Sequence, residues 1–275
     1  MLSRRNLLLS AATAAPLAAA TGPAYAASPV AAPLGAAAAP GSDALLHRAM
    51  SITLTHELGS APAAAAIEPI LYDVSVVWDL PLVPAASIDS IVAYAFGNRP
   101  NADSGVTDPN GGTQVALPDP GPTNELLADA VHAIYTLKPV MIYAQWEISR
   151  FLVSKYGMTS EQVYSVEPII NADGTITYLS TDGVALDAIH HAGSAAALGQ
   201  VAVVGHRDHA KRCIQVSESR GMNAGVAAEV PLPVEYDAES GQAWTRNRGL
   251  YLVHDMYAQL FLKAIALTAA AYPAG

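Results

Sequence analysis

Cysteine is almost absent from this 275-residue chain, which contains a single one, Cys213. One thiol cannot form an intramolecular disulfide, so the fold has to be stabilised by its hydrophobic core. The sequence around it, Ala210–Ile214, is typical of a helix. We therefore expect Cys213 to be a small buried helix residue rather than a nucleophile.

Charge is also scarce, and it is unevenly divided, with 14 basic residues against 24 acidic ones. The formal net charge of −10 becomes more negative if a leader carrying Arg4 and Arg5 is removed. An acidic surface repels polyanions, so we expect no nucleic-acid partner. A long apolar run is missing too, because Pro16, Gly22 and Pro23 interrupt the N-terminal stretch before it reaches the ~20 residues that a bilayer requires. We expect no stable membrane span.

The N-terminus nevertheless has the features of an export signal. The segment Ser3–Arg5 precedes Asn6 and Leu7–Leu9, and Ala24–Ala26 presents small residues at the positions that a signal peptidase reads. Paired arginines before a mildly apolar stretch are typical of the twin-arginine pathway, with an ordinary secretory leader as the alternative. The sequence thus predicts three parts: a twin-arginine-type signal peptide at 1–26, an Ala/Pro/Gly-rich tether at 27–41 and a single α/β domain at 42–275. We expect the mature protein in the periplasm or secreted.

Short apolar runs alternate with longer amphipathic ones along most of the remaining chain. The predicted strands are 88–96, 140–144, 162–166, 200–204 and 226–230, and the predicted helices are 42–57, 123–138, 146–156, 182–198, 208–220 and 244–267. Asn171–Gly174 predicts a hairpin turn, and Ala61–Pro84 has no clear pattern. Repeated strand–helix alternation indicates an α/β, Rossmann-like three-layer fold, with a mostly parallel sheet and helices on both faces.

Candidate ligand-binding residues follow the first four of these strands. They are Gly97 and Asn98 after the first strand, Glu147 after the second, Glu167 after the third, and Gly205, His206, Asp208 and His209 after the fourth. In open parallel sheets ligands bind beyond the carboxyl ends of the strands. The last group lies at the start of a predicted helix, where the helix dipole favours an anion or an acid–base step. We therefore expect a small anionic ligand at this edge.

The segment Val203–Cys213 resembles the YdcF/SanA/ElyC-like family of bacterial envelope proteins, in which a late strand runs into a helix that carries His and, three residues later, Arg. His209 and Arg212 match these two positions, and the order of elements is similar over about 88–260. The resemblance implies a Rossmann-like envelope protein with a role in cell-wall or surface-polysaccharide metabolism. It implies that His209 is an acid–base or hydrogen-bonding group and that Arg212 neutralises an anion. Gln145–Glu147 departs from the family's Ser-Gly-Gly-like turn, which indicates a remote member.

Three functions stay open. The first is an envelope protein that binds or processes a small anionic metabolite or cell-envelope precursor, with His209, Arg212 and Glu167 as candidate catalytic residues. The second is a non-catalytic extracytoplasmic binding protein that uses the loop Asn101–Pro122. The third is a metal-dependent hydrolase that uses His206, Asp208 and His209, with Glu167 or His190 as a further ligand. Nucleotide-binding glycine loops and a Gly-x-Ser-x-Gly elbow are absent from the sequence, so it names no cofactor and no substrate, and it does not indicate an oligomeric state.

Overall fold

The computed structural model describes residues 42–101 and 116–273, which belong to two compact units divided between Val77 and Trp78. The signal peptide predicted at 1–26 and the tether predicted at 27–41 lie outside the described residues, as does most of the loop Asn101–Pro122. The signal peptide and the tether stay predictions, and so does the single domain predicted for 42–275.

The first unit is a pair of helices, α2 (Ser42–Leu58) and α3 (Ala61–Val76). The hydroxyl of Ser60 accepts a hydrogen bond from the Ala63 amide and so caps α3. His47 of α2 lies 2.7 Å from a carboxylate oxygen of Glu68 of α3. The first of these helices was predicted, whereas the second falls in the stretch to which the sequence pattern assigned nothing.

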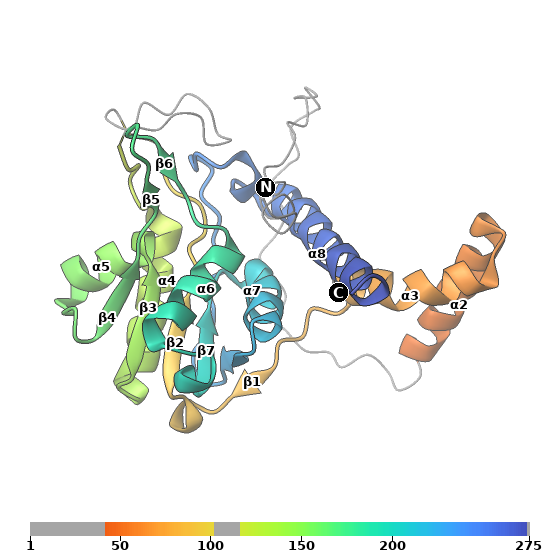
Figure 1. Cartoon of the computed structure of the whole chain (residues 1–275), viewed down its shortest axis with the longest axis horizontal. Coiled ribbons are helices and arrows are strands. Elements are labelled where there is room, and N and C mark those ends of the chain that lie inside the picture. The colour runs from red at the N-terminus through yellow and green to blue at the C-terminus, as the bar shows by residue number, and fades with distance from the viewer. Residues whose placement is uncertain (1–41, 102–115, 274–275) are drawn as a thin grey trace. The chain divides into compact units, whose positions relative to one another are not determined.

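The second unit contains a six-stranded sheet in which every neighbouring pair is parallel, with the strand order β1-β8-β7-β2-β3-β4 (Figure 1). The strands are β1 (Leu82–Val83), β2 (Ser90–Ala93), β3 (Met141–Gln145), β4 (Val163–Val166), β7 (Gln200–Val204) and β8 (Asn223–Ala227). The parallel sheet with helices on both faces confirms the predicted three-layer, Rossmann-like class.

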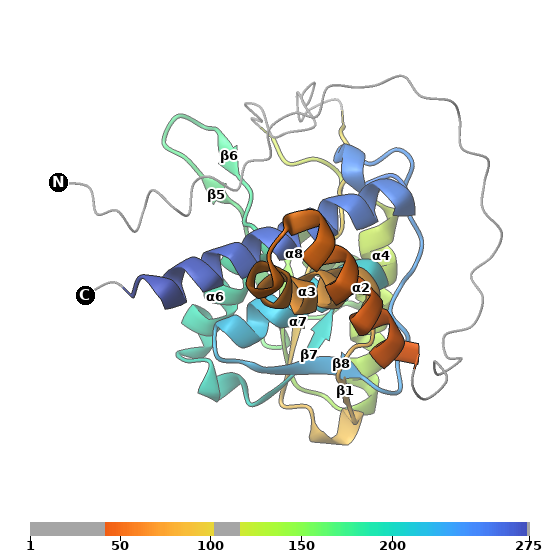
Figure 2. The ribbon, with the colours of Figure 1, turned by 90° about the vertical axis from the view of Figure 1, so that its right-hand side faces the viewer.

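A small hairpin leaves this pattern after β4. Its strands, β5 (Ile169–Ile170) and β6 (Ile176–Thr177), pair antiparallel and stand out from the sheet (Figure 2). Gly174 has a φ of 82°, which a glycine adopts readily, and this confirms the predicted turn.

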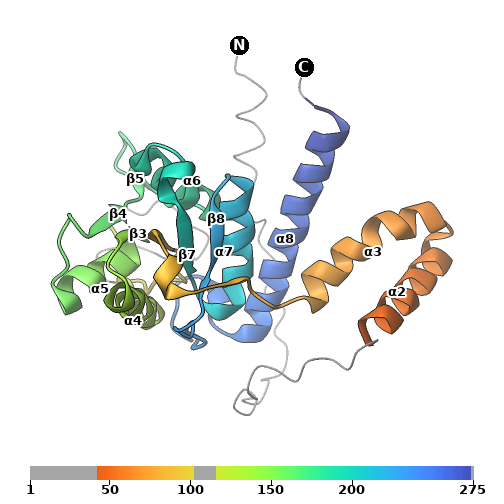
Figure 3. The same cartoon turned by 90° about the horizontal axis from the view of Figure 1, so that it is seen from below.

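Five longer helices and three short ones connect or cover the strands. The helices are α4 (Pro122–Leu137), α5 (Trp146–Tyr156), α6 (Thr181–Ala192), α7 (Arg207–Ser219) and α8 (Arg248–Ala271), and the 3₁₀ turns are η2 (Ala85–Ser87), η3 (Ala196–Leu198) and η4 (Ala243–Thr245). The helix predicted at 182–198 ends early, because Gly193 adopts a left-handed conformation with a φ of 88°. Helices α7 and α8 lie side by side (Figure 3). Across the part of the chain that the structure describes, no helix combines the length and the apolar character needed to span a membrane.

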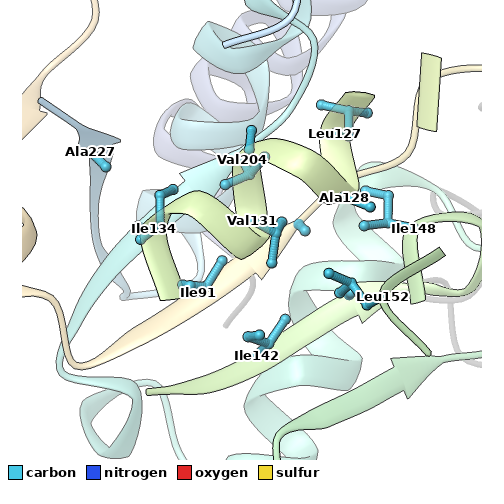
Figure 4. Packing of buried hydrophobic residues seen from close by; sticks show 14 of the residues in the cluster. Ile91, Leu127, Ala128, Val131, Ile134, Ile142, Ile148, Leu152, Val204 and Ala227 are labelled. Carbon is cyan, nitrogen blue, oxygen red and sulfur yellow. The ribbon is translucent and has the colours of Figure 1, made fainter. Parts of the chain in front are cut away.

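Two hydrophobic clusters cover the two faces of the sheet. Figure 4 shows the first, in which Leu127, Val131 and Ile134 of α4 pack over Ile91 and other strand residues. The second cluster covers the opposite face with buried residues of α6 and α7, including Cys213, which confirms that this thiol is a buried helix residue. Consecutive strand residues point to opposite faces, so strands such as β2 and β7 contribute to both clusters.

The strand order places a topological switch point between β2 and β7. From β2 the chain moves to β3 and β4 on one side, and later it returns to β7 and β8 on the other. The loops that leave β2 and β7 therefore diverge at the carboxyl edge, which is where open α/β sheets bind ligands. Ala93, the last residue of β2, pairs in register with Val204, the last residue of β7. The loops after the two strands therefore begin side by side at the carboxyl edge of the sheet.

Candidate functional site

The loop after β2 is fixed by a buried asparagine. Asn124 accepts a hydrogen bond from the Phe96 amide at 2.8 Å and donates one to the Gly97 carbonyl at 2.6 Å. Gly97 has a φ of 71°, and a Cβ there would lie 2.6 Å from the Ser240 hydroxyl and 2.7 Å from the Thr245 hydroxyl. Only glycine fits this position, so Gly97 shapes the loop. The helix predicted at 123–138 begins one residue earlier, at Pro122, and Gly121 is its N-cap residue.

His206, which follows β7, is completely buried beside this loop. Its ring stacks on Phe96 with centroids 4.0 Å apart and planes 14° from parallel. Nδ1 accepts a hydrogen bond from the Asp208 amide, and Nε2 has no partner with hydrogen-bonding geometry. Burial lowers the pKa of His206 to about 4, although the negative charge of Asp208 acts to raise it. The imidazole is therefore neutral at pH 7, and because Nδ1 accepts a hydrogen bond, its proton is on Nε2, which can donate to a ligand.

His209, one turn further along α7, is also buried, with 5% of its surface exposed. Its centroid lies 6.3 Å from that of Phe96 and 5.9 Å from that of Tyr251. Nδ1 lies 3.7 Å from an oxygen of Asp255, too far for a hydrogen bond. Burial and then the Arg212 charge lower the pKa of His209 to about 4, although Asp255 opposes them. His206 and His209 are thus two neutral imidazoles next to the switch point.

Arg212 is engaged by protein groups. It donates to the Asp255 carboxylate at 2.6 Å, the Thr181 hydroxyl at 3.0 Å and the Tyr251 hydroxyl at 3.2 Å. The Asp255 side chain is completely buried, so this ion pair lies in the interior. The family resemblance implied that the positive charge of Arg212 neutralises a ligand anion, but in the structure Asp255 neutralises it.

Asp208 occupies the start of α7 and holds three donors. Its carboxylate accepts from the Tyr236 hydroxyl at 2.7 Å, from Arg248 at 2.9 and 3.2 Å and from Arg207 at 3.2 Å. The Arg207 amide donates to the Pro233 carbonyl, and the Asp208 amide is used by His206. These two amides of α7 are not free to bind an anion.

Gly205 lies in the turn between β7 and α7. A Cβ there would meet the Cys213 sulfur at 3.4 Å, so this glycine permits close packing of strand and helix.

Glu147 and Asn98 form a second polar group at the ends of β3 and β2. Glu147 is 3% exposed, and its Oε2 atom has no hydrogen-bond partner. Burial raises the pKa of Glu147 to about 8, although its own backbone and the Asn98 side chain favour the ionised form. The Asn98 carbonyl accepts from the Gly241 amide at 2.7 Å, which fixes the loop. Since β3 and β7 flank β2, two strand spacings, or about 10 Å, separate the strand before Glu147 from the strand before His206.

Glu167 stays apart from the other predicted residues. It follows β4, the edge strand, and forms a two-bond ion pair with Arg150 at 2.8 and 2.9 Å. Three strand spacings separate β4 from β7, or about 14 Å. Glu167 and His209 are therefore not brought together.

The residues named for a metal site do not form one. Within 42–101 and 116–273, no three His, Cys, Asp or Glu side chains converge in a way that could hold a metal ion. His190 is exposed on α6, and the Asp208 carboxylate is taken by arginines.

Asp255 is the site residue that sequence reasoning missed. It lies on the last predicted helix, 244–267, and not at a strand end, yet this carboxylate is completely buried. The signal was present in the spacing of Tyr251, Asp255 and Gln259, which places three hydrogen-bonding side chains on one face of a helix.

Comparisons with known proteins identify no relative. No protein-family model matches the chain, and neither a curated protein nor a solved structure matches it.

Proposed function

We propose that this chain is an exported protein that binds or processes a small anionic metabolite or cell-envelope precursor at the switch point between β2 and β7. His209 serves as its proton acceptor, and His206 as a hydrogen-bond donor. The observation that carries the proposal is the pair of buried imidazoles beside the switch point: Nε2 of His206 has no hydrogen-bond partner, and Nδ1 of His209 faces Asp255 at 3.7 Å without a hydrogen bond.

An unpartnered buried nitrogen is costly for a fold. Leaving one polar group unsatisfied typically costs about 1–3 kcal/mol, and two such groups lie on one short segment here. Both imidazoles are neutral at pH 7, because burial lowers the pKa of each to about 4. A neutral imidazole can accept a proton or a hydrogen bond from a ligand, which is the usual role of histidine in acid–base chemistry.

The charges around Asp208 favour an anionic ligand. Arg207 and Arg248 share this one carboxylate, which leaves one positive charge in excess among the three groups. The Nε atom of Arg207 is buried and has no hydrogen-bond partner. Guanidinium groups bind carboxylates and phosphates well, because their donors match the geometry of the anion.

Glu147 supplies a different kind of group. Burial raises its pKa to about 8, so at neutral pH the carboxyl group is mostly protonated and can donate a proton. A neutral acid, Glu147, and a neutral base, His209, at one sheet edge support a role in processing a ligand as well as binding it.

The proposed setting comes from the sequence. The paired arginines Arg4 and Arg5 support twin-arginine export, and the resemblance of Val203–Cys213 to the YdcF/SanA/ElyC-like family supports a role in the cell envelope. In that family the Arg212 position would face an anion. Here Arg207 and Arg248 are better placed for that role, because Asp255 already neutralises Arg212.

A thermal-shift screen tests the proposal. The mature chain is heated with sugar phosphates, nucleotides and small carboxylates, each at a concentration far above the expected Kd. A ligand at 100 times its Kd stabilises the folded protein by about 2.7 kcal/mol. We expect at least one anion to raise the Tm of the wild type and to lose this effect in the His209→Gln variant.

The matched control is His190→Gln, which changes an exposed histidine on α6. It should keep the full ligand-induced shift. The proposal fails if the active anion stabilises His209→Gln as much as the wild type, or if no anion in the panel stabilises the wild type.

A further inference from the structure

The inward face of α8 carries a row of polar side chains. Tyr251, Asp255 and Gln259 are its buried residues, and they are four positions apart. A carboxylate that is completely buried needs donors, since burial without them strongly disfavours the charge.

Asp255 is held by donors from two helices. Its Oδ1 atom accepts from Arg212 Nε of α7 at 2.6 Å and from the Tyr251 hydroxyl at 3.1 Å. Its Oδ2 atom accepts from Gln259 Nε2 at 2.7 Å. Three donors fix the position of the carboxylate, so Asp255 is a rigid acceptor between α7 and α8.

The rigid acceptor faces one nitrogen of His209. Nδ1 of His209 lies 3.7 Å from Asp255 Oδ1 and has no hydrogen-bond partner. A lone pair on Nδ1 would repel the carboxylate, whereas an N–H there is attracted to it. We infer that Asp255 is a positioning residue that keeps the neutral His209 imidazole protonated at Nδ1, so that Nε2 is its basic nitrogen.

This inference deepens the proposed function, which makes His209 a proton acceptor. A histidine base needs a defined tautomer, and an acceptor at the other ring nitrogen is the usual way to set it. The charged and titratable groups around the ring are Arg212 and His206, which oppose its protonation, and Asp255, which favours it. Asp255 thus sets which nitrogen is basic, while burial and Arg212 keep the ring neutral.

Nitrogen-15 NMR of the histidine-labelled mature chain at pH 7 measures the tautomer directly. In the wild type we expect His209 to show a protonated Nδ1 and an unprotonated Nε2. The Asp255→Asn variant keeps the shape of the side chain and removes its charge, so the preference should weaken and the Nε2-protonated form should become populated.

The control is Asp182→Asn, which removes the carboxylate that pairs with Arg220 at the far end of α7. It should leave the His209 tautomer unchanged. The inference is overturned if wild-type His209 carries its proton on Nε2, or if Asp255→Asn folds and keeps the wild-type tautomer. The wild-type spectrum decides the matter even if the variant does not fold.

The two proposals can fail separately. A protonated Nδ1 together with a ligand shift that survives His209→Gln would retain the role of Asp255 and reject the proposed function. The reverse outcome would retain His209 as the ligand-binding group and reject Asp255 as the residue that orients it.

Discussion

Replacement of Arg212 with alanine should strongly destabilise the α/β unit. The change removes three hydrogen bonds and leaves the Asp255 carboxylate buried without its cation. Loss of one partner of a buried ion pair typically costs about 3–5 kcal/mol. For a unit of about 200 residues, 1 kcal/mol corresponds to about 2–4 °C, so the Tm should fall by about 6–20 °C.

Urea unfolding of the mature chain measures this loss, and Arg220→Ala is the matched control. Arg220 and Asp182 form an ion pair of the same length, 2.6 Å, but their side chains are 35% and 25% exposed. A pair that water can reach should contribute about 0–1 kcal/mol. If Arg212→Ala loses no more stability than Arg220→Ala, then the buried pair is not what holds α7 to α8, and Arg212 is free to bind a ligand.

The ion pair between Arg212 and Asp255 also predicts a loss of stability at acid pH. Burial opposes ionisation of Asp255, but His209 and Arg212 together lower its pKa below the ordinary value. A lowered carboxyl pKa contributes stability above the unfolded value, near 4, and this contribution is lost as the pH falls further. The Arg212→Ala variant should lose less stability than the wild type over that acid range.

Three other changes test separate parts of the account. Burial raises the pKa of Glu147 to about 8, so the free energy of unfolding should decline as the pH rises from about 4.5 to 8. Urea unfolding at several pH values should show a smaller decline for Glu147→Gln, and an unchanged decline would count against a buried acid. Gly97→Ala should cost more than the ~1 kcal/mol expected for Gly157→Ala, because both glycines have positive φ but only Gly97 is crowded, and equal midpoints in urea would argue against this packing. Replacement of Arg4 and Arg5 with lysine should leave unprocessed precursor in the cytoplasmic fraction, whereas normal processing would contradict twin-arginine export.

Most of the fold could be predicted because its elements are regular. Four of the six strands of the sheet lie in the apolar runs predicted for them, and Gly157 ends α5 in a left-handed conformation. The strand predicted at 226–230 is displaced, because β8 runs from Asn223 to Ala227. Strand β1 was missed because Leu82–Val83 is too short to show any periodicity. Its place at the sheet edge beside β8 depends on long-range pairing.

The site was harder to predict, since its arrangement depends on which side chains pair. The sequence placed Glu167 with His209 because both follow strands, but strand order puts them three strands apart. Arg212 was matched to a ligand because its buried partner, Asp255, is 43 residues away in the chain. Sequence spacing indicates which face of a helix a residue occupies, but not which element that face contacts.

The most direct test of the central claim is an NMR pH titration of the eight histidine rings in the mature chain. We predict that His206 and His209 titrate near pH 4, because both rings are buried. Both rings should therefore be neutral across the physiological range. Midpoints for His206 and His209 near 6.5, the ordinary value for histidine, would show solvated rings and would contradict the proposed site.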